Sequence, residues 1–316
     1  MKIVFFGTPE FAVASLDRLF GAGYDIAAVV TMPDRVGGRG KKLIESDVKR
    51  YAVEHNIPVL QPEKLRSEDF LNKLRELDAD LFIVIAFRML PKVVWDMPRL
   101  GTFNLHASLL PQLRGAAPIN HAIINGLQET GVTTFLINEE IDKGNILLSS
   151  KIEIGADEDA GSLHDRLMKI GADLTLETVR LLESGDFEAK PQPEVEVLLD
   201  APKIFKADCM LDFNVETNRL HDKVRGLSPY PGAWTILNTT DGKQLEVKIL
   251  KTSKMQPEHV GKDLSSGDAV CIGKRLFTKT ADGFIEILEI QPSGKKRMSA
   301  QALLAGYQPK KFVEGL

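Results

Sequence analysis

Residues 81–87 read LFIVIAF, and this run gives the strongest indication of the architecture. It is apolar throughout, so it predicts a strand that is covered on both faces rather than one with a face in water. Similar runs at residues 2–6 and 26–31 are each followed by a helical pattern, at about residues 9–20 and 47–55. Strands and helices alternating in this order predict an α/β domain with a doubly wound, mostly parallel sheet.

The remainder of the first half continues this alternation. Ser67 is expected to cap a helix, because acidic residues and a spaced apolar face follow it. Further strands are expected at residues 102–106 and 132–137, with an antiparallel extension at 146–154. A long amphipathic helix at residues 162–182 is expected to close the unit.

The second part of the chain has a different pattern. Residues 189–205 contain three prolines and little periodicity, which is typical of an extended linker. One helix candidate at residues 216–226 then precedes short β-like runs separated by Gly and Asp turns, which predicts a small β-barrel. We therefore expect a first domain at 1–188, a linker at 189–205 and a second domain at 206–316.

The composition narrows the class of protein. The chain has 316 residues, of which 43% are hydrophobic and 27% charged, within the globular range. Two cysteines, Cys209 and Cys271, are too few for a disulfide framework, and without clustered His and Cys we expect no metal. The first residues, MKIVFFG, start no long apolar segment, and no run approaches the roughly 18 apolar residues of a spanning helix. We expect a cytoplasmic protein with no membrane partner.

Charge is distributed unevenly along the chain. The net charge is −4, yet residues 206–316 hold 17 Lys and Arg against 13 Asp and Glu, while residues 1–205 hold 23 against 31. A second basic stretch lies at residues 35–50. Two interpretations stay open for these regions: contact with a polyanion such as a nucleic acid, or an ordinary solvated basic surface.

Several common chemistries find no support in the sequence. The turn after the first strand, GTPEF at residues 7–11, lacks the second and third glycines of a dinucleotide-binding turn. The GKK at residues 40–42 is not followed by the Ser or Thr of a phosphate-binding loop. With neither a GxSxG nor an HExxH motif, serine-hydrolase and zinc-hydrolase chemistry also lack a basis.

Three polar residues could form a reaction centre. Asn104 and His106 lie two apart in an expected strand, so they share a face at the strand end, where α/β sheets bind ligands. Asp142 also follows an expected strand. An amide donor, an imidazole and a carboxylate are what acyl transfer needs when no covalent nucleophile is available. By type and spacing alone, an equally good interpretation makes them a turn residue, a satisfied polar edge and a loop cap.

Longer motifs surround these residues. Residues 104–119 read NLHASLLPQLRGAAPI, and DKG follows at 142–144. The pattern closely resembles the NxHxSLLPxxRG and DxG signature of formyltransferases that use 10-formyltetrahydrofolate. PDRVGGRGKKL at 33–43 and VRGLSPYPGAW at 224–234 resemble the methionyl-tRNA formyltransferase family within that group. The resemblance runs nearly end to end.

The resemblance implies a Rossmann-like catalytic domain followed by an OB-like β-barrel that binds tRNA. It implies transfer of a formyl group from 10-formyltetrahydrofolate, as co-substrate, to the α-amino group of methionine on initiator tRNA, and we expect a monomer. It places the catalytic roles on Asn104, His106 and Asp142. The implied folate contacts are Phe87, Arg88, Met89, Leu90, Ser108, Leu109, Leu110 and Pro111. The implied tRNA contacts are Arg35, Arg39, Lys41, Lys42 and Lys49, with Arg39 expected to enter the acceptor stem.

One segment departs from the family pattern. Residues 86–91 read AFRMLP where the family commonly has an AYGxILP-like run, so the sequence is one residue shorter there and has Arg in place of Gly. Three alternative functions stay open: a formyltransferase for a small amine, a hydrolase that passes the formyl group to water, and a non-catalytic RNA-binding protein on the same fold. The glycine-rich basic stretch disfavours the first, and the intact Asn104, His106 and Asp142 disfavour the last.

Overall fold

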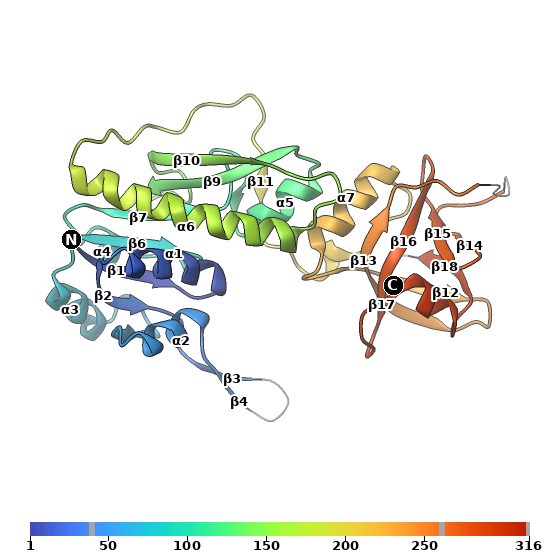
Figure 1. Cartoon of the computed structure of the whole chain (residues 1–316), viewed down its shortest axis with the longest axis horizontal. Coiled ribbons are helices and arrows are strands. Elements are labelled where there is room, and N and C mark those ends of the chain that lie inside the picture. The colour runs from blue at the N-terminus through green and yellow to red at the C-terminus, as the bar shows by residue number, and fades with distance from the viewer. Residues whose placement is uncertain (38–41, 259–262, 314–316) are drawn as a thin grey trace. The chain divides into compact units, whose positions relative to one another are not determined.

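The computed structural model describes residues 1–37, 42–258 and 263–313 (Figure 1). Packing divides the chain into two units. The sheet unit comprises residues 1–115, 130–152 and 164–200, and the barrel unit comprises residues 116–129, 153–163 and 201–316. Both units are therefore discontinuous in sequence. The division into domains at 1–188 and 206–316 with a linker between them remains a proposal.

A seven-stranded sheet forms the centre of the sheet unit. Its order is β10-β9-β7-β6-β1-β2-β5, with β7, β6, β1, β2 and β5 parallel and β9 antiparallel to β7. The predicted doubly wound, mostly parallel sheet is confirmed. The strands are β1 (Lys2–Gly7), β2 (Asp25–Val30), β5 (Val59–Leu60), β6 (Leu81–Ile85), β7 (Thr102–His106), β9 (Glu129–Leu136) and β10 (Ile146–Glu153).

Helices cover both faces of this sheet (Figure 1). On one face, Phe6 and Phe82 pack against Phe70 of α3. On the other, α6 approaches so closely that a Cβ added at Gly171 would lie 2.8 Å from Leu105 Cδ2, which explains a glycine in mid-helix. The helices are α1 (Glu10–Gly21), α2 (Asp47–Glu54), α3 (Glu68–Leu77), α4 (Lys92–Trp95) and α6 (Ala160–Ser184).

The helix start at Ser67 differs from the sequence expectation. Ser67 stands at the N-cap position of α3, but its hydroxyl donates to the Lys64 carbonyl oxygen at 3.0 Å and does not cap the helix. Ser46 is the residue that does cap: its hydroxyl accepts from Lys49 N at 3.1 Å at the start of α2. Residue type alone could not separate these two serines, because the side-chain rotamer decides whether the hydroxyl reaches the helix or the preceding turn.

An antiparallel sheet forms the core of the barrel unit. Its order is β14-β15-β16-β13-β12-β18, and a bridge between Asp268 and Lys311 together with a 2.7 Å bond from Phe312 N to the Gly267 carbonyl brings β18 back beside β14. The sheet is thus nearly closed, as the sequence predicted. The strands are β12 (Ala233–Thr239), β13 (Gln244–Ser253), β14 (Ala269–Ile272), β15 (Arg275–Lys279), β16 (Phe284–Pro292), β17 (Met298–Ser299) and β18 (Pro309–Val313).

Helix α7 (Thr217–Leu227) packs on the sheet of the barrel unit and against helix α5 (Pro118–Ile124). The sequence did not indicate α5. A Cβ added at Gly226 would lie 2.6 Å from Ile124 Cγ1, so the absence of a side chain lets the two helices pack. The remaining elements are β3 (Arg35–Gly37), β4 (Lys42–Ile44), β8 (Arg114–Gly115), β11 (Asp200–Ala201), the 3-10 turn Ala207–Cys209 and α8 (Ala300–Leu304). None of the helices in the described ranges is long and apolar enough to cross a membrane.

Candidate active site

The site begins where β7 ends. Alternation along the strand puts Asn104 and His106 on one face and the buried Phe103 and Leu105 on the other, with Leu105 beneath α6. Asn104 lies beside Val84 of the parallel strand β6. Its carboxamide is partly exposed, and no residue in the described ranges 1–37, 42–258 and 263–313 hydrogen-bonds to it. Its N–H groups are therefore available to a ligand.

The ring of His106 is held in one orientation. The residue is 7% exposed, and its Nε2 lies 2.9 Å from the carbonyl oxygen of Leu113. A carbonyl oxygen can only accept, so this contact assigns the hydrogen to Nε2 and leaves the lone pair of the neutral ring on Nδ1. Nδ1 lies 4.0 Å from Asp142 Oδ2, beyond a direct hydrogen bond but close enough to stabilise a proton there.

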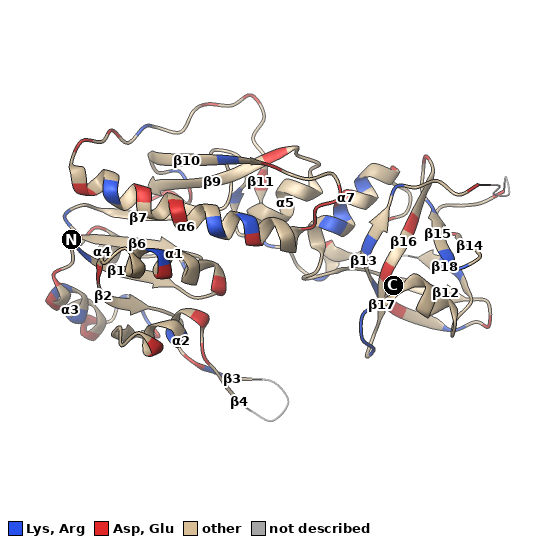
Figure 2. Ribbon diagram, viewed as in Figure 1, with Lys and Arg blue, Asp and Glu red and all other residues tan. Residues whose placement is uncertain are grey.

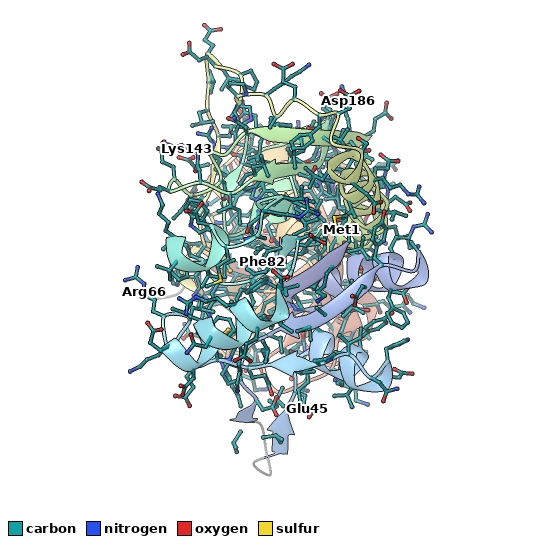
Figure 3. The ribbon with its side chains drawn as sticks, turned by 90° about the vertical axis from the view of Figure 1, so that its left-hand side faces the viewer. Met1, Glu45, Arg66, Phe82, Lys143 and Asp186 are labelled. Atoms are coloured by element: carbon teal, nitrogen blue, oxygen red, sulfur yellow. The ribbon has the colours of Figure 1, made fainter. Side chains whose placement is uncertain are left out.

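Asp142 is fixed on a tight turn. Its φ of 54° is left-handed, a conformation that Asp tolerates better than most residues. Its Oδ2 accepts a 3.0 Å hydrogen bond from Gly115 N, and the side chain is 16% exposed. The next residue, Lys143, is at the periphery in Figure 3, where its ammonium pairs with Glu140. The structure therefore brings Asp142 and His106 together while the adjacent lysine lies outside.

Hydrogen bonds from within the loop and from β9 hold the loop after β7 in place. The Ser108 hydroxyl donates to the Gln112 carbonyl at 2.6 Å, and Thr133 Oγ1 donates to the Ser108 carbonyl at 2.7 Å. Ser108, Leu110 and Pro111 are buried, so three of the four loop residues expected to contact folate help build the loop, while Leu109 is partly exposed. This bracing fixes Leu113, whose carbonyl holds His106.

The second expected folate segment, residues 87–90, follows β6 after the single residue Ala86. Phe87 packs edge-on against Phe6 with ring centroids 5.8 Å apart, Leu90 is buried, and Met89 is 75% exposed. The Arg88 guanidinium donates to the Glu63 carbonyl at 2.9 Å and to the Pro62 carbonyl, and burial lowers its pKa. Arg88 therefore ties this segment to the chain after β5, and Met89 is the exposed side chain of the set.

Two short strands of the basic stretch, β3 and β4, pair as an antiparallel hairpin. Arg35 is exposed there, whereas the Lys49 ammonium on α2 pairs with Asp34 and, at 2.7 Å, with Glu45. Figure 2 shows acidic and basic segments next to each other where the hairpin joins α2. The charge of Lys49 is thus locally compensated, which a count of charges along the sequence does not reveal. Arg39 and Lys41 lie outside the described residues, as does the side chain of Lys42.

The structure places one further residue, Gln192, beside the Asp142 turn, and the sequence did not indicate it. Its Nε2 donates to the carbonyl oxygens of Asp142 and Gly144, at 2.7 and 3.0 Å, and its Oε1 accepts from Arg114. Gln192 lies in the segment expected to be a linker. The only feature of the sequence that could have indicated a role for it is its place as a single polar residue between two prolines. Within the described residues, no group of three or more His, Cys, Asp or Glu side chains could hold a metal ion.

Comparisons with known proteins cover nearly the whole chain. The sequence model described as formyl transferase matches residues 1–179, and the one described as formyl transferase, C-terminal domain, matches residues 203–308. The methionyl-tRNA formyltransferase of Bacteroides fragilis is 49% identical over 311 residues, covering 97% of this chain and 95% of that protein. The methionyl-tRNA formyltransferase of Parabacteroides distasonis is 51% identical over 314 residues, covering 98% and 96%.

Solved structures share the fold at low sequence identity. WlaRD, a sugar 3N-formyl transferase crystallised in the presence of dTDP and 5-N-formyl-THF, superposes with a TM-score of 0.65 at 19% identity, covering 94% of this chain and 99% of WlaRD. HypX from Aquifex aeolicus in complex with tetrahydrofolic acid gives 0.63 at 18% identity, covering 96% of this chain and 47% of HypX. On the sequence matches over both parts of the chain, the protein belongs to the formyl transferase family.

Proposed function

We propose that the protein transfers a formyl group from 10-formyltetrahydrofolate to the α-amino group of methionine on initiator Met-tRNA. The observation that carries this proposal is the identity of about half of all residues to methionyl-tRNA formyltransferases over 97–98% of the chain. The match includes the barrel unit as well as the sheet unit, so it extends beyond the reaction centre.

Asn104 stabilises the charge that develops during transfer. When bound, 10-formyltetrahydrofolate supplies an activated formyl group and a folate nitrogen as the leaving group. An N–H of the Asn104 carboxamide donates to the formyl oxygen as negative charge builds on it. The partly exposed position of Asn104 at the strand end supports this role, because the carboxamide has no competing partner among the described residues.

His106 handles the proton. The amine must lose a proton as it bonds to the formyl carbon, and Nδ1 of His106 carries the lone pair that accepts it, since Nε2 donates to the Leu113 carbonyl. The carboxylate of Asp142, 4.0 Å from Nδ1, stabilises the resulting imidazolium. His106 then returns this proton to the departing nitrogen. The Asp142 carboxylate keeps its bond from Gly115 N.

Residues 87–90, which follow β6 next to β7, have features that suit a folate. Among the described residues, no backbone–backbone hydrogen bond involves the peptide groups of 87–90. A pterin ring presents several hydrogen-bond donors and acceptors along its edge, and unpaired peptide groups next to an apolar wall of Phe87 and Met89 suit such a heterocycle. We propose that this segment contacts the pterin through its backbone and that Arg88 only braces it.

The tRNA is proposed to contact both basic regions. Exposed Arg35 on the β3–β4 hairpin and the excess of Lys and Arg in residues 206–316 would neutralise phosphates, which contributes affinity with little sequence information. The unpaired thiols of Cys209 and Cys271 suit a reducing compartment, and we propose a cytoplasmic monomer.

The proposal is tested by incubating the protein with 10-formyltetrahydrofolate and Met-tRNA, then releasing the methionine and identifying it by mass spectrometry. Formylation of the α-amino group that requires both the protein and the folate supports the proposal. Unmodified methionine accompanied by release of formate would overturn it in favour of a hydrolase.

A further inference from the structure

The side chain of Gln192 lies at the centre of a hydrogen-bond network around the Asp142 turn. Its Nε2 donates to the Asp142 carbonyl at 2.7 Å and to the Gly144 carbonyl at 3.0 Å. Its Oε1 accepts from Arg114 Nη2 at 2.6 Å and from Arg114 Nε at 3.2 Å. Both hydrogens of the amide nitrogen and both lone pairs of its oxygen are therefore used.

The network admits one orientation of this amide. A guanidinium can only donate and a peptide carbonyl can only accept, so Oε1 must face Arg114 and Nε2 must face the turn. Arg114 and Gly115 are consecutive, and Gly115 N donates to the Asp142 carboxylate. Gln192 thus links the loop after β7 to the Asp142 turn on the backbone side, while Gly115 links them on the carboxylate side.

The chain around Gln192 is itself anchored. Lys190 pairs with Ile146 through two backbone hydrogen bonds, from Ile146 N at 2.7 Å and from Lys190 N at 2.9 Å. Further on, the Leu199 carbonyl accepts from Leu113 N at 2.6 Å, next to the carbonyl that holds His106. The segment 190–199 therefore runs beside both loops of the reaction centre, and Gln192 is the point at which its side chain reaches the Asp142 turn.

We propose that Gln192 is a positioning residue that holds Asp142 at its working distance from His106. The inference rests on the proposed function, because it assigns a role to Asp142 in formyl transfer. Two hydrogen bonds from one amide to the carbonyls of Asp142 and Gly144 fix the peptide plane that follows each of these two residues. They therefore fix the left-handed turn from which the Asp142 carboxylate projects. Gln192 itself touches no reacting atom.

The sharpest test is Gln192→Glu, which keeps the size of the side chain and its pairing with Arg114. It replaces the donor Nε2 by an oxygen that faces two carbonyl oxygens, so both bonds to the turn become repulsive. Displacement of a reaction group by about 1 Å costs about 100-fold in rate, and we expect a fall in kcat of that order with KM for tRNA and folate nearly unchanged. Gln192→Met, uncharged and of similar length, should show the same fall, since it also lacks both donors.

A matched control is Gln256→Glu in the barrel unit. Gln256 has a comparable network, because its Nε2 donates to the carbonyls of Lys254 and Phe284 and its Oε1 accepts from Phe284 N. It lies in no part of the reaction centre. Gln256→Glu should keep the wild-type kcat, which would show that an added carboxylate in such a network does not by itself reduce turnover.

A double-mutant cycle with Asp142→Asn separates positioning from general loosening of the fold. If Gln192 acts through Asp142, adding Gln192→Glu to Asp142→Asn should lower the single-turnover rate by no more than about threefold. Full additivity of the two losses, or wild-type kcat in both Gln192 variants, would overturn the inference. Failure of the wild-type protein to formylate Met-tRNA would instead overturn the proposed function, so the two failures are distinguishable.

Discussion

Gly144 offers the most direct perturbation of the Asp142 turn. A Cβ added there would lie 1.6 Å from the Leu136 carbonyl oxygen, 2.8 Å from its carbon and 3.0 Å from Phe135 Cδ2. The nearest atoms are backbone atoms of β9, which cannot rotate out of the way. Since real Cβ contacts essentially never fall below 3.0 Å, Gly144→Ala must move the turn or the strand by about 1.4 Å.

This displacement sets the magnitude of the expected effect. A shift of about 1 Å in a reacting or orienting group costs about 100-fold in rate, so we expect Gly144→Ala to lower kcat for formyl transfer by at least about 100-fold. Overpacking of this kind should also lower the free energy of unfolding by about 1–3 kcal/mol. Single-turnover transfer and a denaturant titration measure the two effects separately.

The control is Gly21→Ala, at the end of α1 in the same sheet unit. A Cβ added at Gly21 meets no heavy atom within 4 Å, and alanine is the better helix former, so kcat and stability should stay at or slightly above the wild-type values. Wild-type kcat in Gly144→Ala would instead mean that the position of the Asp142 turn does not limit the reaction.

Three further predictions concern other parts of the molecule. Asn104→Ala should lower kcat by roughly 10²–10³, the usual effect of removing one oxyanion donor, and steady-state kinetics with near wild-type turnover would contradict its role. Burial, together with the positive charges of Arg225 and Lys254, lowers the pKa of His221 below its ordinary value of 6.5. As the pH falls through about 6.5, His221 is therefore protonated in the unfolded chain before it is protonated in the folded protein. The free energy of unfolding should then fall by up to about 1.4 kcal/mol per pH unit. Denaturant titrations at several pH values should show this dependence in the wild-type protein and not in His221→Gln. Arg39→Ala should impair transfer to Met-tRNA far more than release of formate from the folate without RNA, and parallel assays showing equal losses would count against a tRNA contact.

The sequence predicts elements whose pattern is local. Residues 102–106 were expected as a strand and are one, with the same bounds, because alternation and the following loop mark both the faces and the end. The apolar run at 81–87 likewise predicts the central strand β6, although the strand ends at Ile85, where Ala86 takes a φ of 48°. Helix α5 was not identified because seven residues are too few to show a helical period.

Contacts between residues that lie far apart in the sequence could not be predicted from it. Gln192 lies 50 residues from Asp142, so no spacing rule connects them, and its position between two prolines suggested only a linker. Lys49 was expected to contact tRNA, and nothing in the sequence indicated that the fold places Asp34 and Glu45 on its ammonium. The tautomer of His106 depends on the Leu113 carbonyl, which only the folded loop brings within 2.9 Å.

A comparison of two acceptors distinguishes an enzyme specific for initiator tRNA from a hydrolase. The kcat/KM for formyl transfer from 10-formyltetrahydrofolate is determined with charged initiator Met-tRNA and with charged elongator Met-tRNA, beside a reaction without RNA that records formate release. We expect a strong preference for the initiator and little formate without RNA, as the proposed function requires. Formate release at the same rate with or without either tRNA would contradict it.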